Sequence, residues 1–203
     1  RGPSRSPRGA ERAKHVVDTI WPWHNHDMKY GPLTEEALRG AFAELDAEIE
    51  RPASLIVGGG TAMMLAYGVP VRTADVDAYP RDVPFDEIVP AIRAVARRRG
   101  LAPDWINPHY ETFAHVLPAD YGSRLRPVFA GAKLRVDALG VEDLLVMKCF
   151  AGREKDIGHA RALLRRRPDL GIVERRLQEL SERRVKGAAE ALDFFDDLQG
   201  GGA

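Results

Sequence analysis

The pattern of apolar and polar residues changes its period several times along the chain, which is typical of a protein that mixes helices and strands. After Thr34, apolar residues recur at helical spacing, with Leu38 and Phe42 on one face. Shorter runs are continuously apolar or alternate strictly, as strands do. The spacing predicts helices over 34–50, 61–67, 84–100, 141–150, 154–166, 169–182 and 185–198, and strands over 54–57, 74–79 and 133–139.

The middle of the chain is less regular. Residues 101–107 predict a third strand or an extended segment, and the stretch after them, with Pro108, Pro118 and Pro127, is expected to be rich in loops. The order of elements favours an α+β fold, a small mixed β-sheet backed by helices and followed by a C-terminal helical part. We expect a partly disordered N-terminal arm over 1–33, a core over 34–152 and a C-terminal helical extension over 153–203.

Composition narrows the class of protein without identifying it. Lysine plus arginine and aspartate plus glutamate both number 30, so net charge gives no sign of a nucleic-acid or membrane partner. Two local basic runs, Arg97–Arg99 and Arg165–Arg167, are either solvated helix ends or phosphate contacts. The single cysteine, Cys149, lies in an apolar helical run, where it is expected to pack as a small hydrophobe. Without a disulfide framework or a membrane-spanning run, a cytoplasmic protein is expected.

The most informative segment is 55–77, where a buried strand, a glycine turn, a short helix and a second strand follow one another. The glycines at 58–60 lack side chains, so backbone N–H groups are able to approach a triphosphate at the positive end of the following helix. Asp75 and Asp77 are one residue apart, so on a strand their carboxylates share a face. Mg²⁺ usually takes one or two such carboxylates and completes its shell with substrate phosphates. The segment therefore predicts a metal-dependent nucleotide site.

The same residues resemble a known superfamily. The segment Gly59-Gly-Thr-Ala-Met-Met-Leu-Ala-Tyr67, followed by Arg72-x-Thr-x-Asp-Val-Asp-Ala78, is similar to the signature of the DNA polymerase beta-like nucleotidyltransferases. More narrowly, it resembles bacterial nucleotidyltransferase-like proteins related to the toxins of type IV toxin–antitoxin systems. Further matches follow in order, Asp104-Trp-Ile-Asn107, Glu142-Asp-Leu-Leu-Val-Met-Lys148 and Gly152-Arg-Glu-Lys-Asp156, so that the resemblance spans about residues 52–165.

The resemblance implies roles for particular residues. It implies that Asp75 and Asp77 hold Mg²⁺ and that Asp137, on the polar side of its strand, is the third carboxylate and candidate base. It further implies that an NTP is held by Gly59, Gly60, Thr61, Arg72 and Lys148.

Three of these residues have a second, structural interpretation. The Thr61 hydroxyl is as well suited to capping a helix as to holding a phosphate. Arg72 is suited either to clamping a phosphate or to pairing with a carboxylate. Lys148 lies in an apolar helix, where an unpaired ammonium is costly, and its candidate structural partners are Glu142, Asp143 and Asp156.

The function that follows is Mg²⁺-dependent transfer of a nucleotidyl group from an NTP to a hydroxyl of RNA or of a protein. The resemblance to toxins further implies a role as the toxin of a toxin–antitoxin pair, restrained by a cognate antitoxin. A pseudoenzyme that only binds a nucleotide or a partner is the main alternative, because it needs no third acid. Transfer to a small molecule is another.

Two further patterns suggest other chemistry. Arg153 and His159 fit the loose spacing of a helical ribonuclease motif, which requires both side chains to be exposed together in a cleft. The run His24-Asn-His-Asp27 offers two histidines and one acid, which is too few for a zinc site of defined spacing. We expect these histidines to lie at a surface or an interface.

Overall fold

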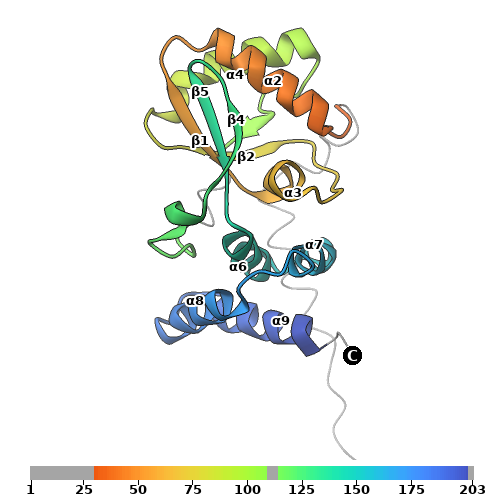
Figure 1. Ribbon diagram of the computed structural model, residues 1–203, viewed down its shortest axis with the longest axis vertical. Coiled ribbons are helices and arrows are strands. Elements are labelled where there is room, and N and C mark those ends of the chain that lie inside the picture. Colours follow the sequence, from red (N-terminus) through yellow and green to blue (C-terminus); the bar gives the residue numbers. More distant parts are fainter. Residues whose placement is uncertain (1–29, 109–113, 201–203) are drawn as a thin grey trace, which may run out of the picture.

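A mixed five-stranded sheet organises the protein (Figure 1). The computed structural model describes residues 30–108 and 114–200. The strand order is β3 (Ile106–Asn107), β2 (Val76–Pro80), β1 (Ala53–Val57), β5 (Leu134–Ala138) and β4 (Arg126–Ala130). The central strand β1 is antiparallel to β2 and parallel to β5, so the predicted α+β class with a small mixed sheet is confirmed.

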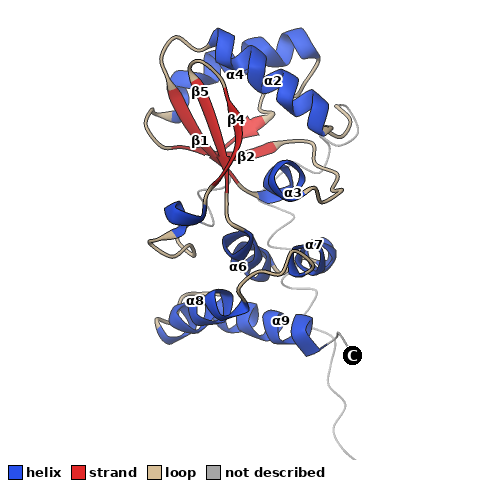
Figure 2. Cartoon of the chain, viewed as in Figure 1, coloured by secondary structure: helices blue, strands red, loops and turns tan. Residues whose placement is uncertain are grey.

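Two helices, α2 (Glu35–Glu48) and α4 (Phe85–Arg99), pack against each other beside the sheet (Figure 2). Thr34 caps α2 by accepting a hydrogen bond from Ala37 N at 3.1 Å, as the sequence predicts. Phe42 of α2 is fully buried, and its ring centroid lies 6.0 Å from that of Trp105. The apolar face of the helix pair and the apolar side of the strands therefore form one core.

The glycine turn joins β1 to α3 (Gly59–Tyr67), and β5 leads into α6 (Val141–Ala151). The last three helices are α7 (Glu154–Leu164), α8 (Leu170–Glu182) and α9 (Ala188–Gly200). Helix α6 contacts all three, and Figure 1 shows the four helices in the half of the molecule away from α2 and α4. None of the helices in the described part of the chain is long and apolar enough to cross a membrane.

The structure differs from the sequence prediction mainly at the ends of elements. Strand β4 was expected to be a loop because of Pro127, but β4 is an edge strand, where a missing N–H is tolerated, and its register shifts at Pro127. Helix α3 begins at Gly59 rather than at residue 61. Of 101–107, only the last two residues form a strand. Residues 1–29, which include the histidine run and all but the last four residues of the predicted arm over 1–33, lie outside the described part. The domain boundary at 152/153 stays a prediction.

Candidate functional site

The glycine turn places a helix N-terminus beside the aspartate strand. The Gly58 N–H donates a hydrogen bond to the Asp77 carbonyl oxygen at 3.0 Å, which ties the end of β1 to β2. Gly58 is the N-cap of α3, and the first turn of the helix therefore contains Gly59, Gly60 and Thr61. The first N–H groups of a helix have no acceptor within it and carry a partial positive charge. This end of α3 is thus a suitable place for a phosphate.

Asp77 lies directly against this helix end. A β-carbon added to Gly59 would overlap the Oδ2 atom of Asp77, so the carboxylate occupies the space that any other side chain would need. Gly59 also has a φ of 56°, in the left-handed region that favours glycine. Within β2, Val76 is buried and Asp77 is half-buried on the opposite side, as the alternation predicts. The turn and the carboxylate are therefore brought together as one site.

Asp75 is held in place by polar side chains from three segments. It precedes β2 rather than lying within it. Its Oδ2 accepts a hydrogen bond from Asn107 Nδ2 at 3.0 Å, and its backbone carbonyl oxygen accepts from the hydroxyls of Thr61 at 3.1 Å and Thr73 at 2.9 Å. The capping role considered for Thr61 is wrong, because Gly58 is the N-cap and Thr61 instead fixes the Asp75 backbone. Its contact with a phosphate stays a prediction.

Sequence reasoning missed the role of Asn107. The residue follows a buried Trp-Ile pair at the end of β3, where a buried amide signals a specific partner. The pairing of β3 with β2 sets Asn107 opposite Asp77, which is two residues after Asp75 in the chain.

The two aspartates suit Mg²⁺ without a third protein carboxylate. Among residues 30–108 and 114–200, no group of three or more His, Cys, Asp or Glu side chains is arranged to hold a metal. Mg²⁺ does not require such a group, since it commonly takes one or two carboxylates together with waters and substrate phosphates. The Asp77 carboxylate beside a helix end suited to phosphate, with the Asp75 carboxylate two residues earlier in the chain, offers the hard oxygens that match that preference.

Asp137 lies on the same face of the sheet as Asp77 but not beside it. It pairs with Ile56 across β5 and β1, whereas Asp77 lies opposite Gly58. The Cα atoms of Asp77 and Asp137 are about 12 Å apart, because two strand spacings across the sheet and two residues along the strands separate them. The Asp137 carboxylate is buried and accepts two hydrogen bonds from Arg135 Nε, at 2.8 and 3.0 Å. The structure therefore pairs Asp137 with Arg135, and a role as base stays a prediction.

Lys148 forms a buried ion pair. Its Nζ donates to Asp156 Oδ1 at 2.8 Å, and Arg153 Nε donates to Asp156 Oδ2 at 2.7 Å. This is the pairing with Asp156 that the sequence allowed for Lys148, and it joins α6 to α7. A contact between this ammonium and a phosphate stays a prediction.

His159 faces the same carboxylate, with Nδ1 3.8 Å from Asp156 Oδ1. Arg153 and His159 thus converge on Asp156 rather than on an open cleft, which does not favour the ribonuclease interpretation.

Arg72 is exposed at the edge of the site. It lines a hollow of about 250 Å³ together with Pro32, Thr73 and Ala74. Thr73 also lies against Gly60, because a β-carbon at Gly60 would come within 3.1 Å of the Thr73 Cβ. The Arg72 guanidinium has no carboxylate partner within the described part of the chain, so its predicted structural ion pair is not formed there.

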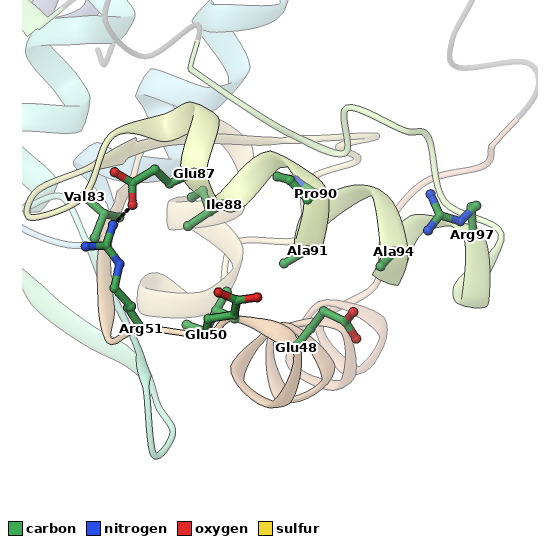
Figure 3. Close-up of a pocket in the computed structure, with 11 residues that line it drawn as sticks. Glu48, Glu50, Arg51, Val83, Glu87, Ile88, Pro90, Ala91, Ala94 and Arg97 are labelled. Atoms are coloured by element: carbon green, nitrogen blue, oxygen red, sulfur yellow. Dashed lines mark ion pairs between the residues drawn. The ribbon is translucent and has the colours of Figure 1, made fainter.

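Two other features are separate from this site. Burial raises the pKa of Cys149 to about 12, so the thiol stays protonated and packs in the core, as expected. A larger groove of about 450 Å³ lies between α2 and α4, lined by Glu48, Arg51 and Glu87 among others (Figure 3). It lies at the start of β1, whereas the glycine turn follows the end of that strand.

Comparison with known proteins agrees with the site. The model of a family described as "Nucleotidyltransferase of unknown function (DUF6036)" matches residues 36–194, more than three quarters of the chain. The matched range includes the glycine turn, both aspartates, Asn107 and the Lys148–Asp156 pair. The comparisons with curated proteins and with solved structures found no match. The chain belongs to this nucleotidyltransferase family, while the links to the polymerase beta superfamily and to toxins stay predictions.

Proposed function

We propose that this member of a nucleotidyltransferase family moves a nucleotidyl group from an NTP to an acceptor hydroxyl of RNA or of a protein, with Mg²⁺. The acceptor oxygen forms a bond to the α-phosphorus, the bond between the α-phosphorus and its bridging oxygen breaks, and pyrophosphate leaves. The observation that carries the proposal is the position of the Asp77 carboxylate directly against Gly59, at the N-terminus of α3.

The residues of the site have separate tasks in this reaction. The N–H groups at the start of α3 would receive phosphate oxygens, and Asn107 would keep the Asp75 carboxylate oriented. Asp75 and Asp77 would hold Mg²⁺, which when bound would neutralise negative charge on the phosphates. Arg72 would add positive charge from the rim of the hollow.

Asp137 is the proposed acceptor of the hydroxyl proton. That role requires its carboxylate to separate from Arg135 and approach the reacting atoms, which the observed pairing opposes. The Asp137→Asn variant tests the step directly, since loss of a general base lowers kcat by about 10²–10⁴-fold.

The test of the main proposal is transfer of label from each of four α-labelled NTPs, with Mg²⁺ and total RNA or lysate protein. A variant with Asp75→Asn and Asp77→Asn should lose the label, because the carboxylates are removed with little change of shape. The matched control carries Asp193→Asn and Asp196→Asn, two exposed acids of α9, and should keep it. Equal labelling by all three proteins would refute the proposal.

A second candidate is a pseudoenzyme that binds an NTP without transferring it. The observation in its favour is the pairing of Asp137 with Arg135, which leaves no third acid beside Asp75 and Asp77 in the described part of the chain. Nucleotide binding that depends on both aspartates, without label in RNA or protein, would support this candidate over the first.

We extend the proposal to a toxin restrained by a cognate antitoxin, on the sequence resemblance alone. Induced expression should then arrest bacterial growth, and the Asp75→Asn, Asp77→Asn variant should not. Normal growth with the active protein would contradict the toxin role and leave the transferase proposal intact.

A further inference from the structure

The two basic runs of the chain have different surroundings. Arg98 and Arg99, at the end of α4, form ion pairs with Glu44 and Glu48 of α2 at 2.8–3.4 Å. Arg161, Arg165, Arg166 and Arg167 at the C-terminal end of α7, which we name the α7 arginine patch, are all exposed. None of these four has a carboxylate partner within residues 30–108 and 114–200. Two of the three arginines of the first run are thus paired with carboxylates, whereas the α7 arginine patch has no such pair in the described residues.

Two acids close to the end of the patch, Glu142 and Asp169, bind backbone groups instead of its arginines. The Glu142 carboxylate accepts a hydrogen bond from Asp169 N at 3.0 Å, and the Asp169 carboxylate caps α8 through Gly171 N and Ile172 N. Both carboxylates accept from backbone N–H groups at the start of α8, and neither is paired with an arginine of the patch.

The patch is attached to the helix that carries the candidate site. Arg166 Nη2 donates to the Gly68 carbonyl oxygen at 3.1 Å, which fixes the end of α7 against the end of α3 (Figure 1). Helix α3 has nine residues and is therefore about 14 Å long. Arg126 lies near the same end, with its guanidinium 5.0 Å from the centroid of the Tyr67 ring. Exposed arginines thus begin one short helix away from the glycine turn.

The chemistry of the patch suits a row of phosphates. All four cations are arginines, whose planar forks bind phosphate oxygens in pairs. Arg161 and Arg165 are four residues apart on α7, so their side chains leave the same face about 6 Å apart. Arg167 has a φ of 54°, a conformation that costs a non-glycine residue about 1–2 kcal/mol.

We infer that the α7 arginine patch and Arg126 bind the phosphate backbone of a nucleic-acid strand whose end reaches the candidate site. The inference rests on the proposed function, because the bound strand is then the acceptor of the nucleotidyl group. It selects nucleic acid over protein among the acceptors proposed above.

The test is the affinity of the full chain for a labelled 20-nucleotide single-stranded RNA and for DNA of the same sequence, by fluorescence anisotropy. The variant carries Arg161→Gln, Arg165→Gln and Arg167→Gln, and leaves Arg166 on Gly68. The matched control carries Arg183→Gln, Arg184→Gln and Lys186→Gln, three exposed cations between α8 and α9. The control matches the patch variant in charge and in backbone conformation, because Arg184 has the same φ of 54° as Arg167.

We expect the patch variant to lose at least tenfold in affinity and the control to stay within about twofold. The slope of log K against log salt should fall by about 2 in the patch variant, since each lost contact to a single strand removes about 0.7. Tighter binding of RNA than of DNA would identify the RNA 2′-hydroxyls as a second determinant of the same surface. The inference would be overturned if both variants lost the same affinity, or if the unchanged protein bound neither RNA nor DNA. It would also be overturned if poly-glutamate displaced the labelled RNA as well as unlabelled RNA does.

The experiments distinguish an error in the RNA-binding inference from an error in the transferase proposal. The Asp75→Asn, Asp77→Asn variant should bind the RNA normally, because these residues lie outside the patch. RNA binding that needs the patch, without any transfer, would refute the proposed function and keep the surface. Transfer to RNA that the patch variant performs as well as the unchanged protein would refute the surface and keep the function.

Discussion

Gly59 and Asp77 depend on each other at the scale of single residues. Alanine at position 59 would be strained by the φ of 56° and would overlap Asp77 Oδ2. We expect Gly59→Ala to reduce both the free energy of unfolding and the affinity for Mg²⁺–NTP, the latter at least tenfold, because the carboxylate must move away from the helix end. Urea unfolding and equilibrium nucleotide binding measure the two effects.

Gly100→Ala is the matched control for this substitution. Gly100 has a φ of 66° at the end of α4, but a β-carbon there would meet nothing within 4 Å. The control should lose only the strain of about 1–2 kcal/mol and bind nucleotide normally. A contrary result would be that Gly59→Ala lowers the free energy of unfolding by no more than Gly100→Ala does, and by the same amount when Asp77 is also alanine. That result would show that the overlap with Asp77 does not cause the loss of stability.

Asp156 is a second residue whose side chain is important for stability, because several basic groups surround its buried carboxylate. Burial alone raises the pKa of its carboxyl, but the surrounding basic groups, His159, Arg153 and Lys148, lower it more strongly, so the pKa lies well below its usual range. We expect Asp156→Asn to cost about 3–5 kcal/mol, because it leaves the buried Lys148 ammonium without its partner. Lys148→Met should cost less, because Arg153 still pairs with Asp156.

The same lowered pKa gives this pair a pH dependence with a definite sign. The stabilisation is fully present above the pKa of an unfolded aspartate, about 3.9, and is lost as the pH falls toward the folded pKa. The difference in unfolding free energy between the unchanged protein and Asp156→Asn should shrink by up to about 1.4 kcal/mol per pH unit below that value. Urea titrations between pH 7 and pH 3 measure it, and a constant difference would contradict the ion pair.

Sequence reasoning identified the elements of the site better than its side-chain partners. The glycine turn and the Asp-x-Asp pair are local signals, because a few adjacent residues determine the geometry. The structure pairs Asp137 with Arg135 on its own strand, a partner that was not predicted from the sequence, and pairs Lys148 with Asp156, one of the three partners proposed for it. Alternation places Asp137 on the correct face of the sheet but carries no information on how many strands separate it from Asp77.

At the scale of elements, the β4–β5 hairpin is held by one carboxylate of α2. Asp46 accepts hydrogen bonds from the backbone N–H groups of Ala132, Lys133 and Leu134 at 3.0, 2.7 and 2.6 Å. Those from Leu134 and Lys133 are the main reason that its pKa is lowered. A β-carbon at Gly131 would overlap the same carboxylate. The hairpin turn and the helix are therefore fitted to each other.

A double-mutant cycle tests this fit. Asp46→Ala and Gly131→Ala should each lower the urea midpoint, the first by removing acceptors and the second by overlap. In the Asp46→Ala background, Gly131→Ala should cost little, because the overlapped atoms are gone. Asp86→Ala, which changes an exposed acid of α4, should leave the cost of Gly131→Ala unaltered. Additive effects of Asp46→Ala and Gly131→Ala would show that the two residues do not interact.

The elements were predictable where local periodicity is strong and not where tertiary position decides. The helices were found to within a few residues, because most of them continue their apolar spacing over three or more turns and the short α3 is marked by the glycine turn. Strand β4 was missed because Pro127 argues against a strand unless the strand lies at a sheet edge. Strand order is not contained in any local pattern, so the edge position of β4 was not available from the sequence.

At the scale of the whole molecule, α6 connects the sheet half to the helical half. It follows β5 directly, and Leu144, Leu145 and Val146 are buried on successive sides of the helix. A helix that is apolar all round needs partners on every side. A contact across the halves is also made by Arg166, which donates to the Gly68 carbonyl oxygen at 3.1 Å. The Tyr67 hydroxyl donates to the Leu139 carbonyl oxygen at 2.9 Å, just before α6 begins.

We therefore expect the sheet and the helices to unfold in one transition, although the sequence suggested a boundary at 152/153. The chain has three tryptophans, and a variant with Trp21→Phe and Trp23→Phe retains only Trp105, which is buried against α4. Its fluorescence reports on the sheet half, and far-UV circular dichroism reports mainly on the helices. Coincident urea curves follow if α6 is shared by both halves, because neither half retains a closed core without it. Separate midpoints would mean that α7, α8 and α9 fold independently of the core and that the predicted boundary is a true domain boundary.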